Sequence, residues 1–130
     1  MIVVDASALL EVLLRTRAAP KVSERLFRPG ETLTAPHLID VEIARVLRRY
    51  EAAGQLDESR AREALTDLAD MSLTRYPHVV LLPRIWELRH NMTAYDAAYV
   101  ALAEAIEVSL VTRDSGLAGA PGHHAVIELL

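Results

Sequence analysis

The sequence contains no cysteine, which excludes disulfide bonds and leaves only oxygen and nitrogen ligands for any metal ion. Aromatic residues are scarce at 5%, and of the 14 basic residues only Lys21 is a lysine. No run approaches the roughly 18 consecutive apolar residues that a membrane-spanning helix needs. Asp5 interrupts the apolar residues at the N-terminus, so a secretory signal is not expected. These absences favour a cytoplasmic protein with no membrane segment.

The acidic residues outnumber the basic ones by 18 to 14, giving a formal net charge of −4. Such a balance does not indicate a broad nucleic-acid-binding surface. The 130 residues are 52% hydrophobic, which is sufficient for one domain with a sizeable core. Because no repeat, linker or low-complexity segment interrupts the chain, we predict a single domain over residues 1–130.

Short continuous apolar runs alternate with segments of helical periodicity along the chain. The patterns predict strands at 2–4, 32–35, 75–80, 108–112 and 125–129, and helices at 7–14, 20–26, 37–53, 57–71, 83–90 and 93–105. This alternation is typical of an α/β fold in three layers, with a short, mainly parallel sheet flanked by helices.

Four acidic residues lie beside apolar sequence, where a charge facing solvent is not expected: Asp5, Glu42, Asp96 and Asp114. Asp5 and Asp114 follow predicted strands, and ligands of parallel sheets bind beyond the carboxyl ends of the strands. Asp96 begins a predicted helix, and Glu42 lies about two turns into another. We therefore expect the four side chains at one edge of the sheet.

Each acid alone has a simpler structural explanation. Asp5 fits a cap of the first helix, and Glu42 fits an ion pair with an arginine on its own helix. Asp96 is favoured by the dipole of its helix, and Asp114 fits a polar turn. Asp40 lies two residues before Glu42 and points to another helix face, so we interpret it as structural. Only the combination indicates a functional site.

Clustered carboxylates repel one another unless a hard cation neutralises them, and an oxygen-only ligand set suits Mg²⁺ or Mn²⁺. Such metals bind phosphates, generate a nucleophile from water and stabilise a leaving oxygen. Because bare carboxylates repel a phosphodiester, the metal would be obligatory. Ser7 and Thr112 are near enough in sequence to hydrogen-bond to the site carboxylates, although helix capping and strand-end packing explain them equally well.

Four segments together resemble the PIN-domain ribonucleases, in particular the VapC toxins of bacterial and archaeal toxin–antitoxin pairs. They are, in order, Ile2-Val3-Val4-Asp5-Ala6-Ser7-Ala8-Leu9, Val41-Glu42-Ile43-Ala44-Arg45-Val46-Leu47-Arg48-Arg49, Thr93-Ala94-Tyr95-Asp96-Ala97-Ala98-Tyr99-Val100-Ala101-Leu102-Ala103 and Leu110-Val111-Thr112-Arg113-Asp114. The third is the most specific, and their order along nearly the whole chain strengthens the resemblance.

The resemblance implies a parallel α/β fold and Mg²⁺- or Mn²⁺-dependent endonucleolytic cleavage of RNA. It maps Asp5, Glu42, Asp96 and Asp114 onto the family's acidic quartet, and Ser7 onto its hydroxyl residue after the first Asp. It also implies a homodimer that a cognate VapB-type antitoxin inhibits. The chain departs from many members in carrying Arg45 where they have Asn, and no acid closely follows the last Asp.

Candidate RNA contacts are Arg45, Arg49 and Arg89, which equally fit solvated charges or antitoxin contacts. Three aromatic residues are candidates for stacking on bases, namely Trp86, Tyr95 and Tyr99. The four-residue spacing of the two tyrosines is more typical of packing on one helix face, for instance at a dimer interface.

Other protein classes fit less well. A phosphoacceptor receiver domain needs a lysine after a late strand, and Lys21 lies far too early. An aspartate-nucleophile phosphatase needs a second Asp two residues after the first, where this chain has Ser7. A catalytically degenerate PIN-like binding module, and an RNA-processing PIN nuclease outside a toxin–antitoxin pair, remain as alternatives.

Overall fold

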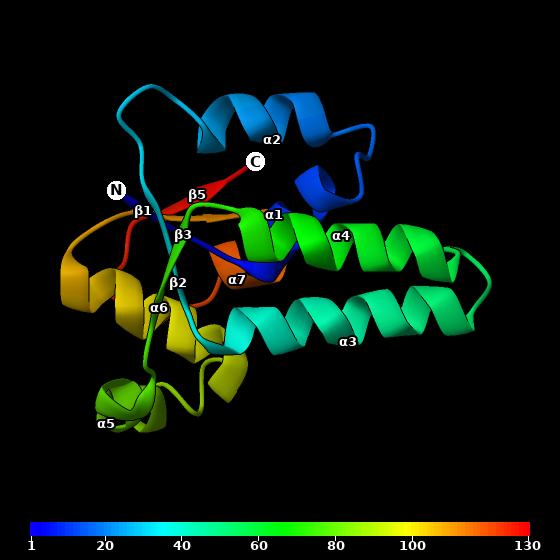
Figure 1. Cartoon of the computed structure of the whole chain (residues 1–130). Coiled ribbons are helices and arrows are strands. Elements are labelled where there is room, and N and C mark those ends of the chain that lie inside the picture. The colour runs from blue at the N-terminus through cyan, green and yellow to red at the C-terminus, as the bar shows by residue number, and fades with distance from the viewer.

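The computed structural model describes residues 1–130 and is organised around one five-stranded sheet (Figure 1). The strands are β1 (Ile2–Val4), β2 (Leu33–Pro36), β3 (Leu73–Tyr76), β4 (Leu110–Thr112) and β5 (Ile127–Leu129). They lie in the order β3-β2-β1-β4-β5, and every neighbouring pair is parallel. In the central register Val3 pairs with Thr34 on one side and Leu110 on the other. The predicted α/β fold with a parallel sheet is confirmed.

Helices connect and cover the strands. They are α1 (Ala6–Leu13), α2 (Ala19–Leu26), α3 (Leu38–Ala52), α4 (Glu58–Asp70), the 3₁₀ helix η1 (Val79–Leu81), α5 (Leu82–Glu87), α6 (Ala94–Ile106) and α7 (Ser115–Ala118). Figure 1 shows the strands between α2 on one side and α5 and α6 on the other. The α3 and α4 helices lie side by side and extend together away from the sheet. None of the helices combines the length and apolar composition that crossing a bilayer requires.

The strand order places a topological switch beside the first strand. From β1 the chain adds β2 and β3 on one side, and it then returns to add β4 and β5 on the other. The connections that leave β1 and β4 therefore diverge, and such a point at the carboxyl ends of parallel strands forms a ligand-binding crevice. Asp5 follows β1 directly and Asp114 lies two residues beyond β4. The topology therefore brings together two acids that are far apart in the sequence.

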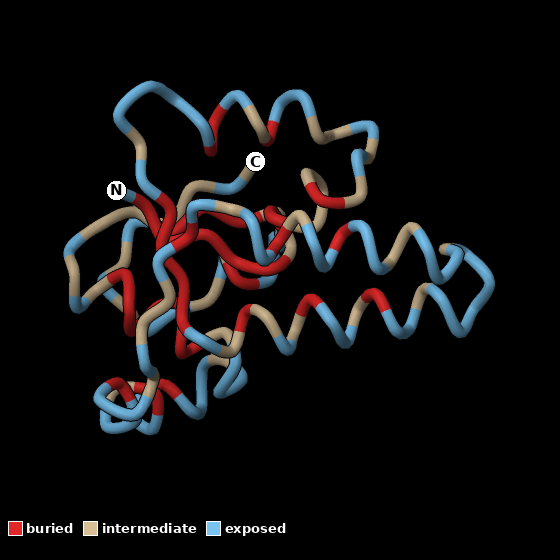
Figure 2. The backbone as a smooth tube through the Cα atoms, viewed as in Figure 1, coloured by how far each residue is buried: buried red, intermediate tan, exposed pale blue.

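The core lies around the central strands, as the buried tube segments of Figure 2 show. All residues of β1 and β4 are buried, as is the continuous stretch of α6 from Ala97 to Ala103. The alanines in this stretch have short side chains, so α6 packs closely against β1, β2 and β4. Because these nearly two turns of α6 are buried on every side, the position of its first turn, which carries Asp96, is fixed.

Most predicted elements agree with the observed ones to within two residues at each end. The strand predicted at 75–80 is wrong, because β3 ends at Tyr76 and Val79–Leu81 form the 3₁₀ helix. Pro77 has no backbone N–H to continue the sheet, and Val79 and Val80 are exposed. The helix predicted at 83–90 ends early, at Glu87, and the short α7 was not predicted.

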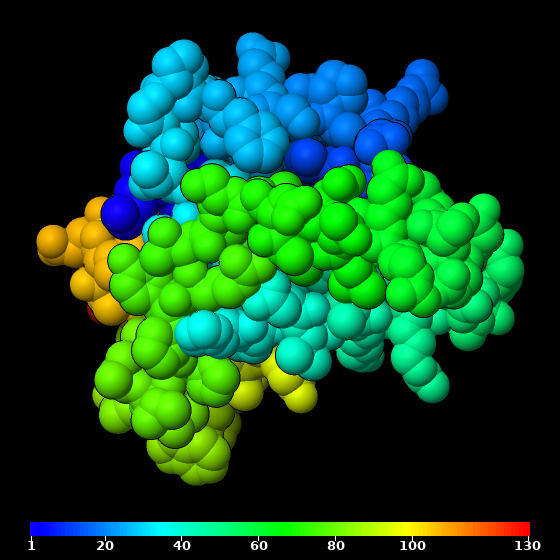
Figure 3. All heavy atoms as spheres, in the orientation of Figure 1, coloured from blue at the N-terminus to red at the C-terminus, as the bar shows by residue number.

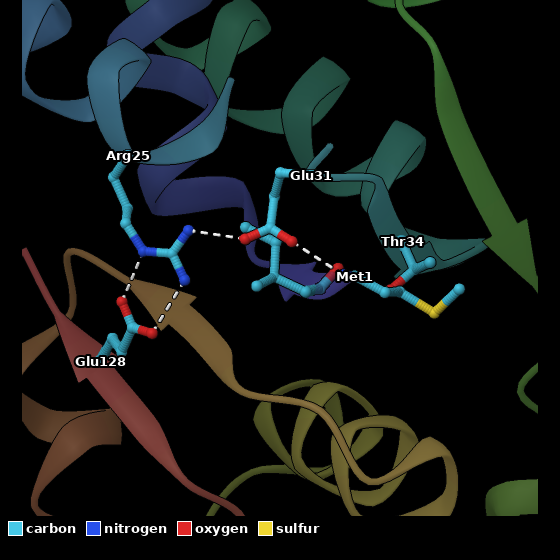
Figure 4. Close-up of polar contacts among 6 residues, drawn as sticks. Met1, Arg25, Glu31, Thr34 and Glu128 are labelled. Carbon is cyan, nitrogen blue, oxygen red and sulfur yellow. Dashed lines mark hydrogen bonds and ion pairs between the residues drawn. The ribbon is translucent and has the colours of Figure 1, made fainter. Parts of the chain in front are cut away.

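A charged cluster attaches the edge strand β5 to the rest of the molecule (Figure 4). Arg25 of α2 is 8% exposed and donates two hydrogen bonds to the carboxylate of Glu128, at 2.7 and 2.8 Å, and one to Glu31 at 2.9 Å. The amino group of Met1 donates to the other oxygen of Glu31 at 2.7 Å. Contact with Arg25 lowers the pKa of Glu128, and the Met1 amine followed by Arg25 lowers the pKa of Glu31. The sequence patterns did not predict this cluster.

Candidate active site

Asp5 is the most buried of the four acids, with 6% of its surface exposed. One oxygen of its carboxylate, Oδ1, accepts hydrogen bonds from the Ser7 hydroxyl at 2.7 Å and the backbone N–H of Ala8 at 3.0 Å, which caps α1. The other oxygen accepts from the Thr112 hydroxyl at 2.5 Å. Burial raises the pKa of Asp5 and the charge of Asp114 adds to this, while the hydrogen bonds oppose it. The carboxylate is therefore held by three hydrogen bonds, but no cationic side chain is paired with it.

The hydroxyls of Ser7 and Thr112 join the ends of β1 and β4. Their oxygens lie 3.2 Å apart, and each accepts one backbone N–H from the segment after β4. Arg113 donates its N–H to Ser7 at 2.9 Å, and Asp114 donates its N–H to Thr112 at 2.9 Å. Both hydroxyls also donate to Asp5, so this polar bridge positions the two acids at the switch point relative to each other.

Asp114 is exposed and caps the short helix α7. Its Oδ1 accepts from the backbone N–H groups of Gly116 at 2.8 Å and Leu117 at 3.3 Å. The Oδ2 atom accepts no hydrogen bond from the protein, so one oxygen remains for a ligand. The cap proposed from sequence for Asp5 is confirmed, whereas Asp114, for which a polar turn was proposed, caps the unpredicted helix α7. Neither cap conflicts with a place in the site.

Asp96 lies in the first turn of α6, where Thr93 caps the helix by accepting the Asp96 N–H at 3.2 Å. Its side chain is partly exposed. Burial is the largest cause that raises the pKa of Asp96, and the negative charges of Asp114 and Asp5 raise it further. Because the charges of both Asp114 and Asp5 act on the pKa of Asp96, the first turn of α6 places Asp96 at the same edge of the sheet as the ends of β1 and β4.

Glu42 reaches this edge from the side, as part of α3. Its Oε1 accepts a hydrogen bond of 2.9 Å from the hydroxyl of Tyr99, a side chain of α6 that is 1% exposed. Burial, followed by the charges of Asp5 and Asp96, raises the pKa of Glu42, while the bond from Tyr99 and the charge of Arg45 oppose it. The four predicted acids therefore form one electrostatically coupled group.

No arginine, lysine or histidine forms an ion pair with any of these four acids. Other partly buried carboxylates of the chain are paired, for example Glu104 with Arg84 and Asp40 with Arg75. The two hydrogen bonds between Asp40 and Arg75, at 2.6 and 2.7 Å, confirm the structural role expected for Asp40. The ion pair considered for Glu42 is not formed.

A cleft of about 520 Å³ opens beside Glu42 and Asp96. It is lined by residues of α3 and of the start of α6: Val41, Glu42, Arg45, Thr93, Tyr95 and Asp96. In Figure 3 the α3–α4 pair and the η1–α5 segment project as two lobes, and yellow atoms around the start of α6 reach the surface between them. The cleft is wide enough for a small ligand, which typically needs about 300–1,000 Å³.

The donor set fits a hard divalent cation, because it consists of carboxylate oxygens that lie within electrostatic reach of one another and form no ion pair. As the side chains stand, no group of three or more histidine or acidic side chains is close enough to hold a metal ion. Mg²⁺ usually takes only one or two protein carboxylates directly and keeps several waters, so it does not need such a group.

The other predicted contact residues separate into two groups. All three predicted arginines are exposed, but only Arg45 lines the cleft; Arg49 and Arg89 lie outside it. Arg49 lies 5.6 Å from the ring of Tyr50, and Arg89 lies 4.6 Å from the ring of Trp86. The suggestion that Tyr99 stacks on a base is wrong, since its ring is buried and its hydroxyl holds Glu42. Its apolar helical position gave no signal of that polar role.

This parallel sheet with acids at its switch point is the arrangement of a known nuclease-type fold. The PIN domain family model matches residues 2–122, and the chain belongs to the PIN-domain family. Its relatives include the ribonuclease VapC9 of Mycobacterium tuberculosis, 49% identical over 88% of this chain and 86% of the relative. The ribonuclease VapC1 of the same organism is 43% identical over 98% of this chain and 96% of the relative.

Solved structures show the same fold. PAE2754 from Pyrobaculum aerophilum superimposes with a TM-score of 0.74 at 24% identity, covering 97% of this chain and 81% of that one. A chain of the VapBC2 complex from Rickettsia felis, bound to a DNA fragment from their promoter, superimposes with a TM-score of 0.71 at 13% identity, over 99% of this chain and 98% of that one. At these identities the likeness concerns the fold alone.

Proposed function

We propose that this protein is an endoribonuclease of the VapC type, acting as the toxin of a type II toxin–antitoxin pair and hydrolysing RNA phosphodiester bonds with a divalent cation, Mg²⁺ or Mn²⁺. The family membership and the ribonuclease relatives support the activity. One observation carries the assignment of the site. The charge of Asp5 raises the pKa of Glu42 and Asp96, and the charge of Asp114 raises the pKa of Asp5 and Asp96. None of the four acids forms an ion pair with a cationic side chain. We take residues 1–130 as one domain.

Asp5, Asp96, Asp114 and Glu42 are the side chains that would hold the cation. When bound, the cation supplies the positive charge that neutralises these carboxylates, polarises the scissile phosphate and activates water. Asp5 is positioned for this by Ser7 and Thr112, and Glu42 by Tyr99. Arg45, which lines the cleft, is placed to neutralise an RNA phosphate there.

Hydrolysis also moves protons. A water would attack the phosphorus and lose a proton to solvent, while the bond to the leaving oxygen would break and that oxygen would take up a proton from solvent. Glu42 and Asp96 would be deprotonated when they hold the cation, so their part in this step is to position it beside the scissile phosphate.

We further propose a VapB-type antitoxin as partner and a homodimer as the assembly. The antitoxin partner is supported by the VapBC2 structure from Rickettsia felis, a toxin–antitoxin assembly with a chain of the same fold. For the second, the exposed apolar side chains of Val79, Val80 and Leu82, 51–78% exposed, are the candidate face. Light scattering of the purified protein on a sizing column measures the mass, and a monomer at all concentrations contradicts the dimer.

The test is cleavage of total RNA by the purified, antitoxin-free protein, with Mg²⁺, with Mn²⁺ and with chelator. We expect discrete products only with the cation, lost in Asp96→Asn. Asp70→Asn is the matched control, because Asp70 is an exposed acid of α4 outside the site. Expression in cells should arrest growth with the wild type and the control but not with Asp96→Asn.

Thermal melting separates a loss of function from a loss of fold. Removing one of the repelling charges should leave the melting temperature of Asp96→Asn, measured without metal, unchanged or raised. A large drop would indicate a structural role for Asp96. Cleavage by Asp96→Asn at the wild-type rate would refute the site, and a folded wild type inactive under every condition would favour the degenerate binding module.

A further inference from the structure

Each of the two acids that line the cleft follows an exposed apolar residue in the sequence. Val41 precedes Glu42 on α3 and is 73% exposed, and Tyr95 precedes Asp96 on α6 and is 66% exposed. Both apolar side chains line the same cleft as the acids. Side chains this exposed contribute little to the core, and apolar groups gathered among polar ones mark a ligand-binding surface.

Arg45 completes this part of the cleft. It lies four residues after Val41, so both side chains project from the same face of α3. Arg45 forms no ion pair with any carboxylate of the protein within 4.0 Å and is exposed, which leaves its guanidinium available to an anion. The cleft therefore offers an aromatic ring, an aliphatic side chain and a cation beside two acids of the proposed cleavage site.

We propose that Tyr95, Val41 and Arg45 form a nucleotide-binding subsite next to the scissile phosphate. A base flanking the cut stacks on the ring of Tyr95, Val41 provides an apolar contact, and Arg45 pairs with the phosphate of that nucleotide. This inference rests on the proposed function, because RNA cut at Glu42 and Asp96 must occupy the cleft that they line. It adds a specificity-determining role for a side chain outside the acidic group.

The neighbouring aromatic residues do not fit this role. The ring of Tyr99 is buried. Trp86 is 67% exposed, but it does not line the cleft and the guanidinium of Arg89 lies 4.6 Å from its ring. Trp86 therefore provides a control for Tyr95, since both are aromatic and equally exposed.

The experiment uses a synthetic RNA that carries the cut site mapped on total RNA, and copies of it with an abasic nucleotide on either side of the cut. Wild type, Tyr95→Ala, Tyr95→Phe and Trp86→Ala are compared by kcat and KM with Mg²⁺. Base stacking on an aromatic residue is typically worth about 1–3 kcal/mol. We therefore expect Tyr95→Ala to raise KM roughly 5- to 150-fold, whereas Tyr95→Phe and Trp86→Ala stay close to wild type.

The abasic copies test the contact itself. At one flanking position the missing base should raise the KM of the wild type by a similar factor, and it should raise the KM of Tyr95→Ala no further. The subsite is overturned if Tyr95→Ala raises KM by the same factor on intact and on abasic RNA, or if it does not raise KM on either. A Tyr95→Ala variant that loses only its affinity for a purified VapB-type antitoxin also overturns it and assigns the ring to that protein contact.

Failure of the subsite and failure of the proposed function have different signatures. A wild type that does not cut RNA with Mg²⁺ or Mn²⁺ refutes the proposed function and the subsite with it. If the wild type cuts RNA and Tyr95→Ala cuts it with the same kcat and KM, only the subsite is refuted. Melting temperatures of the four proteins, expected to be equal because both substituted side chains are exposed, exclude unfolding as the cause of any difference.

Discussion

The hydroxyl of Tyr99 donates a hydrogen bond of 2.9 Å to Oε1 of Glu42, joining α6 to α3 at the edge of the sheet. Tyr99 is buried and burial raises its pKa further above the ordinary value, so it acts as a neutral donor. Since Glu42 has no cationic partner, this bond is what fixes the orientation of its carboxylate. Tyr99 is thus a positioning residue for Glu42.

Tyr99→Phe keeps the buried ring and removes only the donor. We expect the affinity for Mn²⁺, measured by calorimetry without RNA, to fall roughly tenfold, because a hydrogen bond to a charged group is worth about 1.5–3 kcal/mol and part of it is regained from water. In a Glu42→Gln background the same substitution should have little further effect. An equal loss in both backgrounds would show that Tyr99 acts through the fold and not through Glu42.

Thr112 serves both strand-end acids, by donating to Asp5 and accepting the N–H of Asp114. Thr112→Val has nearly the same shape but loses both bonds. We expect unfolding in urea without metal to show a loss of about 2 kcal/mol, since buried groups are left unpaired, and we expect slower RNA cleavage. Thr112→Ser keeps the hydroxyl and should retain most of the activity. Full activity in Thr112→Val would contradict the polar bridge.

Arg25 should make stability sensitive to acid. It lowers the pKa of Glu128 and, after the Met1 amine, that of Glu31, both below the ordinary value of 4.5. A lowered folded pKa contributes stability that is present above the unfolded value and is lost as the pH falls through the folded value. The contribution should therefore be complete near pH 7, begin to fall near pH 4.5, the ordinary glutamate value, and be lost once the pH lies below the lowered folded pKa values.

Arg25→Met tests this directly. At pH 7 we expect a loss of about 3 kcal/mol, the low end for breaking a buried ion pair, because Glu128 has 36% of its side chain exposed. The difference in unfolding free energy between wild type and variant should shrink as the pH is lowered through the acid range. A difference that does not change with pH would indicate lost packing of the arginine stem instead of lost charge.

Arg45 and Arg49 lie one turn apart on α3, but only Arg45 lines the cleft. Arg45→Gln should weaken binding of a single-stranded RNA and reduce the slope of log K against log salt by about 0.7, the value for one phosphate contact. Arg49→Gln should leave the slope unchanged. A reduced slope in both variants would instead favour a basic stripe along the whole helix.

Local patterns in the sequence predicted much of this molecule. Asp5 ends an apolar strand and Asp114 follows another, and in a parallel sheet both positions lie at the carboxyl edge. The periodicity of apolar residues and the continuous apolar runs predict which segments are buried. Thr93, a residue type that often caps helices, predicts where α6 begins. The strand predicted at 75–80 failed because an apolar run beside Pro77 is exposed, which periodicity alone does not reveal.

The sequence by itself determined the parallel α/β class and the positions of four of the five strands, and it singled out four acids as candidates for one site. Only the tertiary structure decided the pairs that span long separations: Tyr99 with Glu42 across 57 residues, Thr112 with Asp5 across 107, and Arg25 with Glu128 across 103. It also decided that Tyr95 faces a cleft and Tyr99 the core, although both lie on one helix. The periodicity of a segment shows which of its own faces is buried. Contacts between distant residues depend also on which faces of different helices and strands pack together, and no local pattern contains that information.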